Sequence, residues 1–195
     1  MNEAKKSVRQ AFYARRKAIE TADRRQGNAD ICRNIAGLPE YRKMRHVTLY
    51  ASDGVEPDLL PLLADRSKCF WFPRYDGAER KYHFARVSAP DELIPGKYGL
   101  PEPPPTAERA ADTVMQLETL HLVPGVAYDS RGTRLGRGGG FYDRLLAGVK
   151  SPVCGVFFAC QKAADLPREP HDRSLDMAVT ENGIEDFIRQ EPGEE

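Results

Sequence analysis

The chain has 195 residues, of which 41% are hydrophobic and 30% are charged, a composition typical of a globular protein rather than a disordered or fibrous one. Its 29 basic and 29 acidic residues give a formal net charge of zero, so no overall field favours nucleic acid or an anionic membrane as a partner. No apolar run approaches the roughly 20 residues of a membrane span, and the polar N-terminus is unlike a signal peptide. We therefore expect a cytoplasmic monomer with one domain over residues 1–195.

The cysteines point to the same compartment. Cys32, Cys69, Cys154 and Cys160 have neither CxxC spacing nor partnered histidines. We interpret them as reduced, mostly buried thiols of a cytosolic protein rather than as zinc ligands or a disulfide framework.

Two helices are predicted at the start of the chain. Helical spacing predicts an amphipathic helix over residues 3–22, with an apolar face made of Ala4, Val8, Ala11, Phe12, Ala18 and Ile19. The basic residues between them are interpreted as a solvated face, the more common role of such residues. A second helix is predicted over residues 30–38 and ends at Pro39, because proline disfavours helical backbone in the residue before it.

The middle of the chain predicts strands and a rigid loop. Short apolar runs predict buried strands at residues 46–51 and 69–72, the second closed by Pro73. A more open alternation at residues 81–87 predicts a strand nearer an edge of the sheet. Residues 95–105 (PGKYGLPEPPP) contain five prolines and two glycines, which exclude helix and regular sheet and predict an extended, semi-rigid loop.

The second half of the chain continues the alternation of helices and strands. A helix is predicted over residues 108–116, and buried strands are predicted at residues 120–123, 153–158 and 177–180. Such alternation favours an α/β sandwich of three layers, in which helices flank a mostly parallel central sheet. Ligands of such sheets bind beyond the carboxyl ends of the strands, where the segment after Val123 would lie.

The segment from Arg131 to Arg144, RGTRLGRGGGFYDR, holds five glycines and four arginines between a predicted strand and a predicted helix start. Glycines let backbone N–H groups approach a ligand closely, and a helix start adds free N–H groups at the positive end of its dipole. Arginines add forked donors that suit phosphate oxygens. Asp143 would be out of place there unless a cation lay between it and the phosphates, and Mg²⁺ is usually held by one or two protein oxygens in this way. We therefore interpret this glycine-rich loop as a site for a nucleoside triphosphate and Mg²⁺.

The loop matches neither common phosphate-binding motif. It contains no GxxxxGK[ST], and the GxGxxG that begins at Gly136 fails at its last position, which is Phe141. The alternative interpretation is a mobile, solvated loop, but its position between strand and helix signals favours anion binding.

A second polar cluster lies in the proline-bounded segment LPREPHDRSLD, residues 166–176. His171 and Asp172 are too isolated to predict a catalytic dyad, because no serine or cysteine nucleophile motif accompanies them. By default Asp172 is a turn residue, and the alternative is that it supplies the second carboxylate for the cation at Asp143.

The segment LVPGVAYDSRGTRLGRGGGFYDR resembles the signature of the 5-formyltetrahydrofolate cyclo-ligase family, also called methenyltetrahydrofolate synthetases. Further segments that follow the family's order extend the resemblance over nearly the whole chain, namely KKSVR, LPEY, SDGVE, FPR, YGLPEP and LPREPHD. The resemblance implies a Rossmann-like sandwich related to the CoA-transferase and sugar-phosphate-isomerase type. It also implies ATP- and Mg²⁺-dependent closure of 5-formyltetrahydrofolate to 5,10-methenyltetrahydrofolate, with release of ADP and phosphate.

The resemblance implies roles for individual residues on the nucleotide side. Lys5 and Arg9 match ATP contacts of the family, and their spacing would place them on one face of a helix. The ATP-binding loop would consist of Arg134, Leu135, Gly136, Arg137, Gly138, Gly139, Gly140, Phe141 and Tyr142. Asp143 and Asp172 match the magnesium carboxylates of the family, and Arg137 and Asp143 are the expected catalytic residues.

On the folate side, Glu56 matches the family's pterin-binding glutamate, whose carboxylate can accept two hydrogen bonds from the ring. Tyr98 lies where the family often places an aromatic residue near the substrate. The part of the glycine-rich loop expected close to the folate is Arg137, Gly138, Gly139, Gly140 and Phe141.

The chain departs from the family's usual pattern at several positions. Gly139 stands where many members carry a lysine, Phe141 replaces a more usual tyrosine, and the segment from Glu56 to Pro73 is shorter than usual. The leading interpretation is the cyclo-ligase, and one alternative is a paralog with the same ATP site that acts on another substrate or binds folate without turnover. Another is a non-enzymatic phosphate or RNA binder, which the zero net charge and the lack of a basic stripe with interleaved aromatics disfavour.

Overall fold

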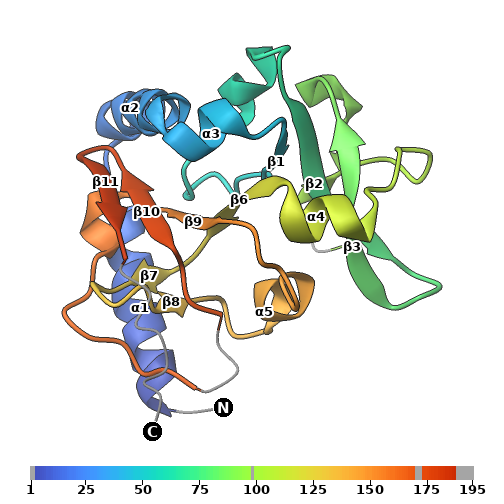
Figure 1. Ribbon diagram of the computed structural model, residues 1–195. Coiled ribbons are helices and arrows are strands. Elements are labelled where there is room, and N and C mark those ends of the chain that lie inside the picture. The colour runs from blue at the N-terminus through green and yellow to red at the C-terminus, as the bar shows by residue number, and fades with distance from the viewer. Residues whose placement is uncertain (1–2, 98, 170–172, 188–195) are drawn as a thin grey trace, which may run out of the picture.

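The computed structural model in Figure 1 describes residues 3–97, 99–169 and 173–187. Its centre is a seven-stranded sheet with the order β11-β10-β9-β6-β1-β2-β3. These strands are β1 (His46–Thr48), β2 (Cys69–Asp76), β3 (Lys81–Val87), β6 (Thr119–Pro124), β9 (Val153–Val156), β10 (Met177–Thr180) and β11 (Gly183–Asp186). The inner strands run parallel, and β3 and β11 are antiparallel edge strands. The predicted α/β fold with a mostly parallel sheet is therefore confirmed, as is the edge position of residues 81–87.

Helices cover both faces of the sheet (Figure 1). On one face lie α2 (Thr21–Gly37), α3 (Pro39–Lys43) and the 3₁₀ helix η1 (Leu60–Ala64), and α4 (Asp112–Leu117) and α5 (Phe141–Leu145) lie on the other. The N-terminal helix α1 (Glu3–Lys17) packs instead against a small hairpin formed by β7 (Ala127–Tyr128) and β8 (Arg134–Leu135). The remaining elements are η2 (Pro90–Glu92), the strand pair β4 (Ile94–Pro95) and β5 (Pro101–Glu102), and η3 (Ala159–Gln161).

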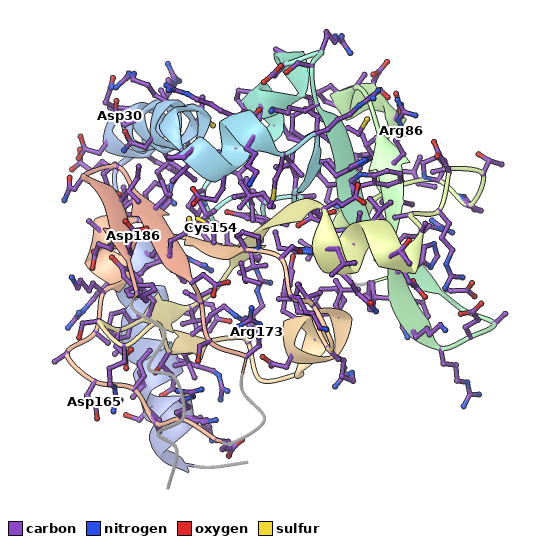
Figure 2. All side chains as sticks on the ribbon, in the orientation of Figure 1. Asp30, Arg86, Cys154, Asp165, Arg173 and Asp186 are labelled. Atoms are coloured by element: carbon purple, nitrogen blue, oxygen red, sulfur yellow. The ribbon has the colours of Figure 1, made fainter. Side chains whose placement is uncertain are left out.

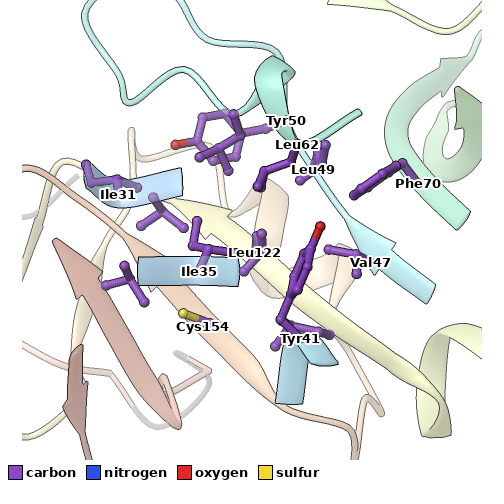
Figure 3. Close-up of a cluster of buried hydrophobic side chains, with 14 of the residues drawn as sticks. Ile31, Ile35, Tyr41, Val47, Leu49, Tyr50, Leu62, Phe70, Leu122 and Cys154 are labelled. Carbon is purple, nitrogen blue, oxygen red and sulfur yellow. The ribbon is translucent and has the colours of Figure 1, made fainter. Parts of the chain in front are cut away.

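The largest apolar core lies between the sheet and α2 (Figure 3). It gathers side chains from several elements, including Ile31, Ile35, Tyr41, Val47, Leu49, Leu62, Phe70, Leu122 and Cys154. Because side chains alternate between the faces of a strand, Val47 points into this core while Thr48 faces the opposite layer, where its hydroxyl lies beside the buried His121. Both faces of the sheet are therefore covered, which explains why its strands read as continuous apolar runs.

The predicted helix over residues 3–22 is wrong at its end, and its predicted inward face is confirmed for Val8 and Phe12 but not for Ala11 and Ala18. The structure ends α1 at Lys17 and starts α2 at Thr21, after an extended Glu20. Ala11 and Ala18 are exposed, whereas Lys5, Phe12 and Arg16 are buried. The inward side of α1 therefore combines apolar residues with buried cations, and the interpretation of its cations as a solvated face fails for Lys5 and Arg16.

The second predicted helix, over residues 30–38, begins too late. The structure extends α2 back to Thr21, because the buried Gly27 packs against Phe158 and the guanidinium of Arg24 lies 5.4 Å from the centre of that ring. Polar residues thus form part of the packed surface of this helix, and no apolar periodicity could reveal it. Pro39 follows the end of α2 as predicted, but it also opens α3, where its fixed φ suits a first helical turn.

Several predicted strand and loop boundaries are also corrected. Strand β2 continues through Pro73 to Asp76, because β1 ends opposite Trp71 and no neighbouring strand on that side requires an N–H from the proline. The segment 95–105 is not free of sheet, since β4 and β5 pair through Ile94 with Glu102 and Pro95 with Pro101. The strands at residues 46–51 and 153–158 end early, at Thr48 and Val156. The helix at residues 108–116 starts later, at Asp112.

Figure 2 shows charged side chains such as Asp30, Arg86 and Asp165 at the periphery, with Cys154 inside the molecule. All four cysteines are free thiols, two of them buried and two partly buried, as predicted. Among the described helices, we find none that combines the length and the apolar character that a membrane span requires.

Candidate active site

A cavity lies where the strand order of the sheet reverses. Strand β1 is followed along the sheet by β2 on one side, and its other neighbour β6 is followed by β9. The chain leaves the carboxyl ends of β1 and β6 in opposite directions, which opens a crevice between them. A cavity of about 700 Å³ occupies this place, and its walls include Tyr50 after β1 and Gly125 after β6. The expected position beyond Val123 is therefore correct.

The glycine-rich loop forms one wall of the cavity. It leaves the β7–β8 hairpin at Leu135 and enters α5 at Phe141. Gly138 and Gly140 have φ values of +100° and +58°, which disfavour any other residue at these two positions. A side chain at Gly138 would also crowd Arg9, whose Cζ atom would lie 3.2 Å from the added Cβ. The glycines therefore let the backbone lie directly against the N-terminal helix.

Cationic side chains from distant parts of the chain converge on this loop. The Arg9 Nε donates a hydrogen bond of 2.8 Å to the carbonyl of Gly136, and Lys5 Nζ lies 3.2 Å from Glu169 Oε2. The Nη2 of Arg134 donates to Asp143 Oδ1 at 2.9 Å. The cavity wall thus carries the cations Lys5, Arg9 and Arg134, which suit phosphate oxygens, beside the carboxylates Glu169 and Asp143, which offset part of their charge.

A network of two arginines and two carboxylates lies where Arg137 of the glycine-rich loop meets Glu56 at the cavity wall. The Nη2 of Arg137 lies 2.7 Å from Glu56 Oε1 and also pairs with Asp53. From the other side, Arg16 reaches Asp53 Oδ2 at 3.3 Å and Glu56 Oε1 at 3.6 Å. Burial raises the pKa of the Glu56 carboxyl, and Arg137 opposes that effect by favouring the charged form.

Aromatic rings also line the cavity. The rings of Tyr82 and Phe141 meet edge to face with centres 4.2 Å apart, and Phe141 meets Tyr142 in the same way at 4.8 Å. Burial raises the pKa of Tyr142, so its hydroxyl stays protonated. A flat heterocycle could therefore pack against rings while its edge reaches the carboxylate of Glu56.

The proline-rich segment forms part of the cavity's rim. Leu100, Pro101 and Glu102 line the cavity. Glu102 is buried, and its carboxylate accepts hydrogen bonds from the backbone N–H groups of Tyr75 at 3.0 Å and Lys97 at 3.3 Å. Glu102 thus fastens the segment to β2, and Tyr98, the predicted substrate contact, lies outside the described residues.

Most of the residues predicted for the site do line one cavity. They are Lys5, Arg9, Glu56, Arg134, Gly136, Arg137, Gly138, Gly139, Gly140, Phe141, Tyr142 and Asp143. Leu135 does not line it, because its side chain packs beside Phe12 in an apolar cluster. Asp172 lies outside the described residues, and elsewhere no group of three or more potential metal ligands comes together. The pairing of Asp143 and Asp172 at a metal therefore stays a prediction.

Sequence reasoning missed Arg16, Asp53, Tyr82 and Glu102 as parts of the site. Arg16 carried a usable signal, because it lies seven residues after Arg9 and eleven after Lys5, and therefore on the same helical face. Tyr82 and Glu102 carried none, since only the folding of the sheet edge brings them to the cavity.

The relatives and the solved structure that resemble this chain carry the names of one enzyme. The 5-formyltetrahydrofolate cyclo-ligase of Mycolicibacterium smegmatis is 31% identical over 193 residues, which cover 91% of this chain and 93% of the relative. The enzyme of that name from Haemophilus influenzae is 27% identical, over 90% of this chain and 97% of the relative. The NMR structure of Aquifex aeolicus 5,10-methenyltetrahydrofolate synthetase superposes with a TM-score of 0.83 at 33% identity, over 98% of this chain and 96% of that one.

The sequence profile of the 5-formyltetrahydrofolate cyclo-ligase family matches residues 1–181. This match spans all the elements that build the cavity, from α1 through the glycine-rich loop to β10. The chain therefore belongs to the 5-formyltetrahydrofolate cyclo-ligase family of enzymes.

Proposed function

We propose that this protein uses ATP and Mg²⁺ to convert 5-formyltetrahydrofolate to 5,10-methenyltetrahydrofolate, releasing ADP and phosphate. The family and the names of its relatives support the reaction. The observation that carries the proposal is the continuity of one cavity from a cation-lined glycine loop to a buried carboxylate beside aromatic rings. A nucleotide and a folate could thus meet within a single enclosed space.

On the nucleotide side, the proposal assigns the phosphates to the glycine-rich loop. Loop backbone N–H groups can approach the phosphates, because Gly138 and Gly140 adopt left-handed conformations there. Arg9 and Lys5 on α1 would neutralise phosphate charge from the facing side. Phosphoryl transfer depends mainly on such charge neutralisation and on positioning.

On the folate side, the proposal assigns the pterin ring to the wall that holds Glu56. The Glu56 carboxylate can accept hydrogen bonds from the amino group and ring N–H of a pterin. The rings of Tyr82 and Phe141 would pack against the heterocycle and exclude water. The formyl group of the substrate would then face the phosphates across the glycine-rich loop.

The chemistry follows from the poor leaving ability of a formamide oxygen. The formyl oxygen attacks the γ-phosphorus of ATP, a P–O bond forms, and the bond to the bridging oxygen breaks to release ADP. N10 of the folate then attacks the activated carbon and loses its proton, and the C–O bond breaks as phosphate leaves. The positive charge that remains is shared by N5 and N10 of the methenyl bridge. Arg137, which belongs to the glycine-rich loop and contacts Glu56, is suited to hold the phosphoryl group during transfer.

Asp143 is the described residue that would hold Mg²⁺. Its carboxylate lines the cavity, keeps partial exposure and is oriented by Arg134 through one oxygen. Mg²⁺ commonly takes only one or two protein carboxylates and completes its shell with phosphate oxygens and water, so this donor set fits. A bound Mg²⁺ would neutralise charge on the phosphates.

The test is a spectrophotometric assay of purified protein with 5-formyltetrahydrofolate, in which ATP and Mg²⁺ are omitted in turn. Methenyl product that forms only when both are present supports the proposal. Product that forms in the presence of a metal chelator would refute the Mg²⁺ requirement. Calorimetric binding of Mg-ATP without product would favour the alternative of a paralog with a different substrate.

A further inference from the structure

Arg16 is a buried cation on the helix that also carries Lys5 and Arg9. Its side chain is 1% exposed, and its guanidinium contacts the two carboxylates Asp53 and Glu56 at 3.3 and 3.6 Å. Burying a positive charge costs free energy unless an anionic partner offsets the loss of hydration. Here the partner is the carboxylate assigned to the pterin.

Arg137 contacts the same two carboxylates but from the cavity side. Its side chain is 44% exposed, and it belongs to the glycine-rich loop. Glu56 is only 4% exposed with Arg137 in this position. In the proposed complex, a pterin that binds Glu56 from the cavity would take the place of the Arg137 guanidinium.

Without Arg137, the buried carboxylate of Glu56 would remain beside the partly buried carboxylate of Asp53. Burial and the neighbouring Asp53 both raise the pKa of Glu56, and protonation would remove one of the acceptors that the pterin needs. The other groups that act on Glu56 are Arg16 from α1 and the hydroxyls of Tyr50 and Tyr142. Of these, only Arg16 carries a positive charge.

Arg16 is held so that it cannot follow Arg137. Its backbone carbonyl accepts a 2.7 Å hydrogen bond from Arg24 Nη2, and Arg24 Nη1 donates to the carbonyl of Val55 at 2.8 Å. Arg24 lies on α2, so it joins α1 to the loop that carries Glu56. The Arg16 guanidinium also lies 3.4 Å from the carbonyl of Gly125 at the end of β6.

We propose that Arg16 is a positioning residue of the folate subsite, which stays paired with Asp53 and Glu56 when Arg137 turns to the phosphates and so keeps Glu56 ionised and oriented toward the pterin. The inference rests on the proposed function, because it takes Glu56 as the pterin acceptor. It assigns the two arginines different tasks at one pair of carboxylates. Arg16 is the permanent counter-ion, and Arg137 is the exchangeable one.

The test compares the variants Arg16→Met and Arg16→Lys with Arg15→Met. Arg15 is an exposed arginine on the same helix, packed over the ring of Phe12, and it is the matched control. Steady-state assays with the folate or the nucleotide varied give KM and kcat for each, from mildly acidic to mildly basic pH. Thermal melting shows whether each variant folds.

We expect Arg16→Met to raise KM for the folate about tenfold or more, because a hydrogen-bonded charge partner is lost from a buried site. Its KM for ATP should stay within about twofold. The pH below which the folate KM rises should move upward, because Glu56 then takes up a proton more readily. Arg16→Lys should restore that pH profile, because it restores the charge, while Arg15→Met should match the unmodified protein.

A folate KM and pH profile unchanged in Arg16→Met would overturn the inference. If Arg16→Met does not fold, Arg16→Lys decides alone: one ammonium cannot bridge both carboxylates as a guanidinium does, so the folate KM should rise about threefold or more at an unchanged pH profile. An unchanged folate KM in that variant also overturns the inference. Absence of product with the unmodified protein is a different result, because it refutes the proposed function itself.

Discussion

Replacement of His121 by glutamine should remove an acid-sensitive contribution to the stability of the fold. His121 lies on β6, is fully buried, and donates from Nε2 to the carbonyl of Met115 at 2.7 Å. Its Nδ1 lies 3.4 Å from the Thr48 hydroxyl, which donates to it. Both hydrogen bonds suit a neutral imidazole, so folding selects the uncharged form.

The magnitude follows from the pKa. Burial lowers the pKa of His121 from 6.5 to about 4. Because the folded-state pKa lies below the unfolded one, this contribution is fully present above pH 6.5 and is lost as the pH falls toward about 4. The difference corresponds to about 3 kcal/mol, with a slope of up to about 1.4 kcal/mol per pH unit.

The assay is urea unfolding followed by fluorescence of Trp71, the single tryptophan, from about pH 7.5 to about pH 4.5. Near neutral pH, His121→Gln should cost about 1–2 kcal/mol through poorer hydrogen bonding. That deficit should shrink steadily as the pH falls, and it should reverse near the acid end. A stability difference that does not depend on pH would refute the reasoning, since it would mean that His121 is not held neutral.

Three further predictions concern the cavity. Asp143→Ala should lower turnover by about 100-fold or more at saturating substrates, and unchanged turnover in the same assay would remove Asp143 from the metal site. Gly139→Lys should tighten ATP binding, measured by calorimetry, about threefold, because it adds a cation where a side chain meets nothing within 4 Å. Gly138→Lys should weaken ATP binding, because φ at this position is +100°. Equal ATP affinities of the two variants would show that the phosphates lie elsewhere. A non-hydrolysable ATP analogue should tighten folate binding about fivefold or more by drawing Arg137 off Glu56, and this coupling should vanish in Arg137→Met; equal coupling in both proteins would contradict the exchange.

The parts of the fold that could be predicted are those whose signal is local. Residues 177–180 are three apolar residues followed by the β-branched Thr180, and β10 has these bounds. The strands β7 and β8 could not be predicted, because the register joins only Ala127 with Leu135 and Tyr128 with Arg134. Two residue pairs leave no periodicity, and their pairing depends on how the chain turns between them.

The residues of the site also differ in whether their signal in the sequence is local. The glycine-rich loop carries its signal in consecutive residues, so its place at the cavity could be predicted from the residues themselves, and its binding of a nucleotide and Mg²⁺ stays a prediction. Glu56 was identified only through family resemblance. Arg16 was interpreted as one of several solvated cations; its spacing from Lys5 and Arg9 could have placed it on their helical face, but its partner Asp53 lies 37 residues further along the chain. The ion-pair partner of a charged residue on a helix depends on how that helix packs in the fold.

The N-terminal helix also has a consequence for how the protein folds. Arg9 bonds to Gly136, 127 residues later, and Arg16 lies against Gly125, 109 residues later. Contacts of such long sequence separation form late, because the entropy of closing the loop must be met first. During synthesis α1 is therefore made with its basic stripe unpaired, and it docks only after the glycine-rich loop exists. A nucleotide that binds only the docked form would stabilise it by mass action. The ligand would thus also strengthen the attachment of α1 to the glycine-rich loop.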